Sequence, residues 1–205
     1  MRLILSIFLF CGLFTAGAQD DSLLNKFIAD IANTCVNLDY TYTARVSGVN
    51  NNGSGSLLSQ GHMWSLKGNG VEMYCDGTTV WVVDPSSKEV IIEPVSDEQE
   101  TAFLTNPAQI VLSIGDSFKV SSVNVSSDAK SQIFSLVPKS ESAIEYLNVE
   151  LLNGSALIRN MSFALNDGTL VTIKVSSMKL TPMVSVEMFK PQTVFDSGWI
   201  VTDLR

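Results

Sequence analysis

Few residues in this chain could do acid–base, nucleophilic or metal chemistry. The 205 residues include one histidine, His62, and three cysteines. A histidine relay needs an orienting carboxylate and a nucleophile beside the imidazole, and a zinc site needs several converging histidine or cysteine ligands. The spacing around His62 supplies neither set. We therefore expect a histidine on a sheet face, no resident metal or cofactor, and no enzymatic activity.

An acidic cluster at residues 97–100 is the other candidate for ion binding. It reads Asp-Glu-Gln-Glu and lacks the regular ligand spacing of a calcium loop. Acidic side chains are favourable in the first turn of a helix. The cluster therefore predicts a solvated helix start and not a calcium site.

The cysteines divide between an N-terminal leader and the body of the chain. Cys11 lies in an apolar run near the start, whereas Cys35 and Cys75 lie beyond it. Export from the cytoplasm would permit a disulfide between Cys35 and Cys75. Two buried thiols are the alternative, because free cysteine packs as a small apolar residue. The sequence leaves both open.

The N-terminus has the pattern of a secretory signal peptide. Arg2 gives a positive start, residues 3–14 are almost all apolar, and residues 16–18 read Ala-Gly-Ala, which is the small-residue pattern of a cleavage site. The apolar run is shorter than the roughly 20 residues that a membrane-spanning helix needs. We expect a cleaved signal at residues 1–18 and a single exported domain at residues 19–205.

The composition points to a large buried apolar surface. Hydrophobic residues make up 45% of the chain and charged residues 17%, and the mean hydropathy is +0.23. The formal net charge is −8, from 13 Lys+Arg against 21 Asp+Glu, and no stretch gathers basic residues. Nucleic-acid binding is excluded, because it needs a basic surface. The apolar surplus fits either a packed core or a pocket for an apolar ligand.

The periodicity predicts one amphipathic helix, then mainly strands. Residues 20–22 offer N-cap side chains, and apolar residues then repeat at helical spacing to about residue 35. Two more short helices are expected, one starting at residue 97 and one at residues 108–112. Laid on a sheet, the apolar faces of these helices would form a lid. The lid candidates are Leu24, Phe27, Ile28, Ile31, Phe103 and Leu104.

Alternation with a period of two predicts about twelve strands, and an Asn- and Gly-rich turn at residues 48–55. The strands are expected at residues 38–46, 56–66, 71–75, 78–83, 89–93, 118–125, 132–137, 144–152, 156–165, 169–179, 184–189 and 199–204. We find no linker or repeat that would divide them. The fold class is therefore mainly β (α+β), with a single antiparallel sheet long enough to curl, covered by about three short helices.

A sheet that curls without closing would present an apolar trough on its concave face. Large apolar side chains at strand positions could line this trough, or could simply fill a core. The candidates are Tyr40, Tyr42, Trp64, Met73, Trp81, Val83, Phe134, Leu136, Phe163, Met178 and Met188. Their number, with few charges around them, favours an adaptable apolar pocket.

Several of these residues lie in short motifs that resemble those of the LolA family, the periplasmic carriers of outer-membrane lipoproteins. Residues 61–64 (Gly-His-Met-Trp), 76–85 (Asp-Gly-Thr-Thr-Val-Trp-Val-Val-Asp-Pro) and 89–90 (Glu-Val) resemble the family's run "G-x-x-W … D-G-x-x-x-W-x-Y-x-P … x-V". Residues 134–138 resemble its "F-x-L-x-P" strand, and residues 186–189 with 199–203 resemble its closing "F-x-F … V-x-V-x-D". The motifs follow the family's order over nearly the whole mature chain.

The resemblance implies a half-open barrel, lidded by helices, that holds the acyl chains of lipoproteins. It also implies a periplasmic location, an inner-membrane lipoprotein-releasing transporter that loads the protein, and an outer-membrane acceptor. Trp64 and Trp81 fall on the motif tryptophans. One departure concerns the loop after residue 66, where family members carry an arginine that helps to hold the lid shut. Here the loop begins with Lys67, which lacks the forked donors of arginine.

These observations favour a monomeric, non-catalytic chaperone for acylated lipoproteins. Three alternatives stay open. The same fold could bind a different lipid or small hydrophobic ligand in the cell envelope, it could serve a small-molecule enzyme or a sensor of mislocalised lipoproteins, or its apolar face could be no more than a core.

Overall fold

The structure is a computed structural model that describes residues 21–95 and 107–205. The predicted signal peptide, the helix expected to start at residue 97, and the lid candidates Phe103 and Leu104 lie outside these described residues. Two α-helices, α1 (Ser22–Ala32) and α3 (Pro107–Ser117), and a short 3-10 helix, η1 (Val186–Phe189), occur in the described part. None of these helices is long and apolar enough to cross a membrane.

All twelve strands of the described part of the chain belong to one sheet. The strands are β1 (Cys35–Val46), β2 (Val49–Gln60), β3 (Met63–Gly68), β4 (Val71–Cys75), β5 (Thr79–Asp84), β6 (Glu89–Pro94), β7 (Phe118–Val125), β8 (Ser131–Pro138), β9 (Ile144–Leu152), β10 (Ile158–Leu165), β11 (Leu170–Thr181) and β12 (Ile200–Asp203). Their order is β12-β6-β5-β4-β3-β2-β1-β11-β10-β9-β8-β7. The mainly-β class predicted from the sequence is confirmed.

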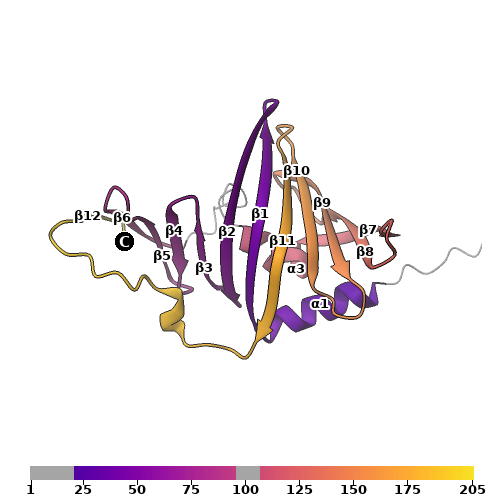
Figure 1. The fold of residues 1–205 in the computed structure, drawn as a ribbon, viewed down its shortest axis with the longest axis horizontal. Coiled ribbons are helices and arrows are strands. Elements are labelled where there is room, and N and C mark those ends of the chain that lie inside the picture. Colours follow the sequence, from indigo (N-terminus) through magenta and orange to yellow (C-terminus); the bar gives the residue numbers. More distant parts are fainter. Residues whose placement is uncertain (1–20, 96–106) are drawn as a thin grey trace, which may run out of the picture.

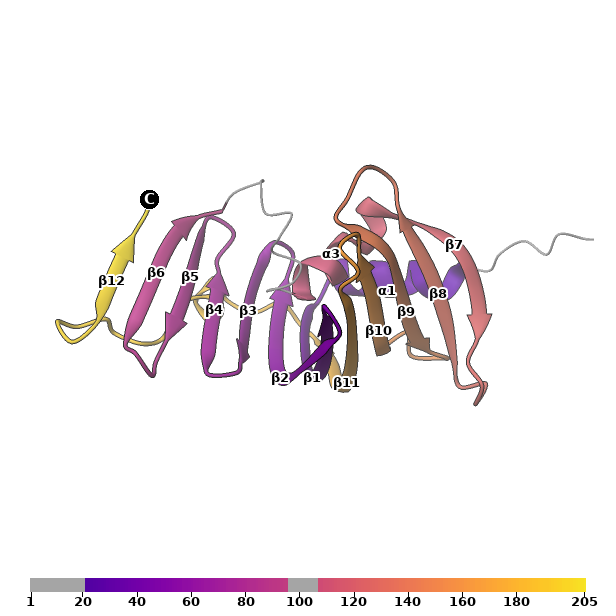
Figure 2. The same cartoon turned by 90° about the horizontal axis from the view of Figure 1, so that it is seen from above.

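The sheet consists of two meanders that meet at its centre, where β1 pairs with β11. The edge strands β7 and β12 lie at opposite ends, so the sheet curls without closing (Figure 2). One detail of the prediction was wrong. The sheet is not wholly antiparallel, because β12 pairs with β6 in parallel. The chain crosses from β11 to the far edge before it forms β12, and it therefore enters that strand in the same direction as β6 (Figure 1).

Helices α1 and α3 lie on one side of the sheet, and α3 reaches the central strands β2, β1 and β11, with which it lines a cavity (Figures 1 and 2). We call this side the inner face and the opposite side the outer face. In α1, Leu24, Phe27 and Ile31 are buried, as the helical spacing predicts. Asp21 stands at the N-cap position, but its side chain makes no capping hydrogen bond.

The segment predicted as a turn at residues 48–55 is instead the first half of β2. A turn at Ser47 and Gly48 joins β1 to β2, and residues 50–55 pair with β1 in continuous register. Gly53 and Gly55 lie opposite Tyr42 and Tyr40. A Cβ at Gly53 would lie 2.5 Å from Tyr42 Cε1, and one at Gly55 would lie 2.8 Å from the Tyr40 hydroxyl. These glycines therefore make room for the two rings inside a strand, and they do not mark a loop.

Two other predicted strands also differ. The strand expected at residues 56–66 is divided by a turn in which Gly61 has a φ of 56°. The strand expected at residues 184–189 is the helix η1, whose start is capped by the Ser185 hydroxyl accepting the Glu187 N–H at 3.4 Å. Val186 and Met188 are exposed here. Their alternation with polar residues resembles that of a strand, but no strand in residues 21–95 and 107–205 pairs with this segment.

Candidate functional site

The inner face of the sheet is apolar over most of its strands. One row that crosses neighbouring strands contains Leu38, Leu57 and Leu66, which are paired directly. A second row contains Val36, Trp64 and Cys75. Directly opposed residues on antiparallel strands share one face, so both rows point to the same side. On the other half, Phe134, Leu147 and Phe163 are almost wholly buried on this face.

The two helices close this face with apolar side chains of their own. Leu24, Phe27 and Ile31 of α1 belong to the same buried cluster as Ile110 and Ile114 of α3. The helices touch at Gly115, where a Cβ would lie 3.1 Å from Ile28 Cγ2. The absence of a side chain at this residue lets α3 approach α1 closely. The interior is therefore bounded by the sheet on one side and by two packed helices on the other.

A small cavity of about 10 Å³ lies beneath α3, between this helix and the central strands of the sheet. It is lined by Leu38, Tyr40, Leu57, Val111, Ile158, Met161, Ile173 and Val175. A space of this volume holds at most about one water molecule. The interior is therefore closed at this cavity, and α3 would have to move before an acyl chain could enter there.

Polar side chains appear where the inner face ends, near the tip of β1 and β2. The amide of Asn69, in the turn between β3 and β4, donates to the hydroxyl of Tyr42 at 2.6 Å. The Tyr40 ring lies 6.4 Å from that of Tyr42, centroid to centroid. Burial, with a smaller contribution from Tyr42, raises the pKa of Tyr40 to about 12. The Tyr40 phenol therefore stays neutral, and the two hydroxyls with the Asn69 amide form a polar end to the apolar interior.

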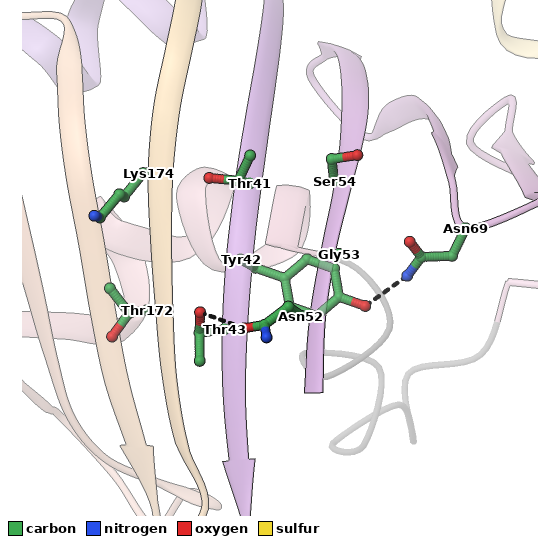
Figure 3. Close-up of a pocket in the computed structure, with 9 residues that line it drawn as sticks. All are labelled: Thr41, Tyr42, Thr43, Asn52, Gly53, Ser54, Asn69, Thr172 and Lys174. Carbon is green, nitrogen blue, oxygen red and sulfur yellow. Dashed lines mark hydrogen bonds between the residues drawn. The ribbon is translucent and has the colours of Figure 1, made fainter. Parts of the chain in front are cut away.

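A polar hollow of about 490 Å³ lies at the same tip of the long strands (Figure 3). Its lining is Thr41, Tyr42, Thr43, Asn52, Gly53, Ser54, Asn69, Thr172 and Lys174. The Thr43 hydroxyl donates to Asn52 Oδ1 at 2.7 Å, which orients both side chains. Hydroxyls and amides dominate this hollow, so it does not suit an acyl chain.

The structure brings most of the predicted trough residues together on the inner face. Tyr40, Trp64, Phe134, Leu136 and Phe163 are buried in the inner cluster. Tyr42, Met73 and Met178 are half-buried against it. Met188 does not join them, because this residue is 55% exposed in η1.

Trp81 and Val83 lie on the outer face, away from this interior. They pack in a second cluster with Tyr74, Val90 and Ile92, and the C-terminal segment supplies Phe195 and Trp199 to the same cluster. The Phe195 and Trp199 rings meet edge to face with centroids 5.0 Å apart.

A trough that includes both Trp64 and Trp81 would need side chains from two faces of one sheet. Trp81 alternates with Val80 and Val82, and these two valines are the residues of β5 that contact the inner cluster.

Lys67 also points to the outer face. Its ammonium lies 3.3 Å from Glu72 Oε2 and 5.5 Å from the centre of the Tyr74 ring. The contact with Tyr74 is the main reason that its pKa is raised, and Glu72 adds to the shift. Lys67 therefore contributes to the outer face and makes no described contact with α1 or α3. In the turn between β3 and β4, the side chain that reaches Tyr42 is that of Asn69. The sequence pattern indicates no more than a turn at this residue.

The remaining sequence candidates have structural roles. Cys35 and Cys75 are buried free thiols, so the disulfide alternative is not realised in this structure. Burial raises the pKa of both. His62 lies in the exposed turn after β2 and not on a sheet face, and its carbonyl accepts the Cys75 S–H at 3.7 Å. No group of three or more metal-ligating side chains occurs in residues 21–95 and 107–205.

The sequence model of the family described as "Outer membrane lipoprotein carrier protein LolA" matches residues 67–192, which is more than half of the chain. The chain belongs to the LolA family. The family match covers the sheet from the end of β3 to β11, together with α3 and η1. No curated protein sequence matches this LolA family chain.

Two solved structures repeat the fold of this LolA family member at low sequence identity, and a third is less similar. An uncharacterized conserved protein from Thermus thermophilus is similar, with a TM-score of 0.55 and 10% identity, over 89% of this chain and 98% of the other. A DUF1329 family protein from Desulfovibrio piger has a TM-score of 0.50 and 11% identity, over 82% and 95% of the two chains. A LolA superfamily protein from Nitrosomonas europaea has a TM-score of 0.44 and 12% identity, over 84% and 98%.

Proposed function

We propose that this protein is a non-catalytic periplasmic carrier that shields the acyl chains of lipoproteins between the inner and the outer membrane. The observation that carries the proposal is the continuous apolar inner face, from Trp64 on one half of the sheet to Phe163 on the other, with α1 and α3 closing over it. The family match supports a lipoprotein as cargo. The predicted signal peptide at residues 1–18 supports the periplasm.

The physical need for such a carrier follows from the cost of exposing hydrocarbon. Each methylene that leaves an apolar environment for water costs about 0.8 kcal/mol. Acyl chains therefore do not cross an aqueous compartment unescorted. A carrier has to cover the acyl chains and then release them. Helices that are held on a sheet by side-chain contacts alone can move away from it, so they can serve as a cover that opens.

The composition of the interior supports binding and not catalysis. Phe27, Leu147 and Ile110, from a helix, a strand and a second helix, have no measurable exposure and carry no reactive group. The ionisable side chains that touch the interior include Tyr40 and Cys75, whose raised pKa values keep them protonated near neutral pH. Neither can act as a base there.

Release of a lipoprotein from membranes tests the proposal directly. Purified mature protein is added to spheroplasts that hold a labelled outer-membrane lipoprotein together with the loading transporter. We expect the label to appear in the soluble fraction as a one-to-one complex with the carrier. If the protein binds a fluorescent acyl probe but releases no lipoprotein, the cargo is a different hydrophobic ligand. If it binds neither, the carrier proposal is wrong.

A further inference from the structure

Ser59 places a lone hydroxyl in the apolar interior. The residue is 3% exposed, and its side-chain oxygen has no hydrogen-bond partner. Ser59 pairs directly with Val36 on β1 and with Trp64 on β3, and both belong to the inner cluster. The hydroxyl therefore points toward the inner face, between two apolar side chains.

Such a group is unusual, because a buried hydroxyl without a partner has given up its hydrogen bonds to water and has gained none in return. In residues 21–95 and 107–205, the one other side-chain oxygen of this kind is Asp21 Oδ1. Ser131 is equally buried, and its hydroxyl donates to Glu150. Gln60, the next residue after Ser59, has both ends of its amide paired with Val184. The structure thus pairs comparable polar groups and leaves Ser59 without a partner.

The position of Ser59 connects the hydroxyl to the space that a ligand would enter. Leu57 precedes it by two residues on the same face of β2 and lines the small cavity beneath α3. Val111 of α3 lines the same cavity. Movement of α3 away from the sheet would therefore widen this space next to Ser59.

We propose that the Ser59 hydroxyl donates a hydrogen bond to the carbonyl oxygen of an ester- or amide-linked acyl chain held in this interior. This inference rests on the proposed carrier function and names the chemistry that the carrier selects. A hydrocarbon chain has no acceptor to offer the hydroxyl. A carboxylate or phosphate would need a compensating cation, since an isolated charge is far more costly to bury than a neutral carbonyl. A neutral ester or amide provides the acceptor without a charge.

Two probes that differ in one carbonyl separate this hydrogen bond from the burial of hydrocarbon. One probe is a monoacylglycerol, whose chain is joined by an ester, and the other is its ether analogue with the same chain length. Their affinities for the mature protein are measured by displacement of a fluorescent acyl probe. We expect the ester to bind about threefold to tenfold more tightly, which is the range of one neutral hydrogen bond.

The variant Ser59→Ala removes the donor, and Ser65→Ala is its matched control. Ser65 is also buried, but it pairs with Tyr74 of the outer cluster. We expect Ser59→Ala to lose the preference for the ester, to keep its affinity for the ether, and to melt at a higher temperature. We expect Ser65→Ala to keep the preference.

The outcomes separate this inference from the proposed function. The role of Ser59 would be overturned if the unmodified protein bound the ester and the ether equally, or if Ser59→Ala kept the preference for the ester. Either result would leave the proposed carrier function intact. Binding of neither probe nor of the fluorescent reporter would overturn both. A loss of preference in Ser59→Ala alone would support both.

Discussion

The side-chain amide of Gln60 forms two hydrogen bonds with the backbone of Val184. Its Nε2 donates to the Val184 carbonyl at 3.1 Å, and its Oε1 accepts the Val184 N–H at 2.7 Å. Gln60 is the last residue of β2, and Val184 lies near the start of the segment that runs from β11, which ends at Thr181, to β12. This pair therefore ties the C-terminal segment to the sheet before that segment brings Phe195 and Trp199 onto the outer face.

Gln60→Ala should loosen the C-terminal segment without disturbing the interior. The substitution leaves the backbone groups of Val184 without their partners, so we expect a loss of about 1–3 kcal/mol of stability. Hydrogen exchange should rise at residues 183–199 and stay unchanged in α1 and β9. Gln192→Ala is the control, because Gln192 is exposed and bonds to neighbouring carbonyls of its own segment. Equal exchange in the two variants would show that the pair does not anchor the segment.

Trp64 should report an acyl chain in the interior, whereas Trp81 should not. The chain has three tryptophans, so proteins that retain one of them can be made by replacing the others with phenylalanine. Trp64 belongs to the inner cluster and Trp81 to the outer one. A fatty acid with a nitroxide on its chain quenches fluorescence by contact, and we expect strong quenching in the Trp64 protein alone. Quenching of Trp81 to the same extent would place the chain on the outer face.

The comparison of sequence and structure shows which features local patterns can predict. The strands at residues 71–75 and 118–125 have the predicted bounds, because alternation and flanking turns define them locally. The first half of β2 could not be predicted in this way. Glycine is typical of turns, so the sequence around Gly53 predicts a turn. Its place in a strand depends instead on the ring of Tyr42, which lies opposite it on the neighbouring strand β1.

The candidate site was predictable as a set of apolar residues but not as a surface. Period-two alternation places Trp64 and Trp81 on definite faces of their own strands, but it does not state how two strands align. That alignment depends on the register of β3, β4 and β5, in which Trp64 lies opposite Cys75 and Trp81 lies opposite Tyr74. Ser59 gave no sequence signal, because a serine in a strand has no distinguishing pattern until its partners are known.

Gly115→Leu should open the closed state. A leucine at this residue needs space that Ile28 fills, so α3 would be displaced from α1, and overpacking of this kind costs about 1–3 kcal/mol. The cavity beneath α3 is too small for an acyl chain, so binding there requires α3 to move, and a larger open population raises the apparent affinity. We expect a lower melting temperature with faster association of a fluorescent acyl probe. Ser117→Leu, at the exposed end of α3, should change neither, and slower association in Gly115→Leu would contradict a lid role for α3.

The thiols of Cys35 and Cys75 should be unreactive in the folded protein and reactive after unfolding. Burial is the main cause that raises both pKa values, so the thiolate, which is the reactive form, is scarcer at pH 8 than in an unfolded chain. We expect a thiol reagent to label the native mature protein slowly and to label two thiols per chain in denaturant without reductant. Material exported to the periplasm is the decisive sample, since a disulfide could form there. No labelling of that material in denaturant, with two thiols appearing after reduction, would show that Cys35 and Cys75 are joined in the cell.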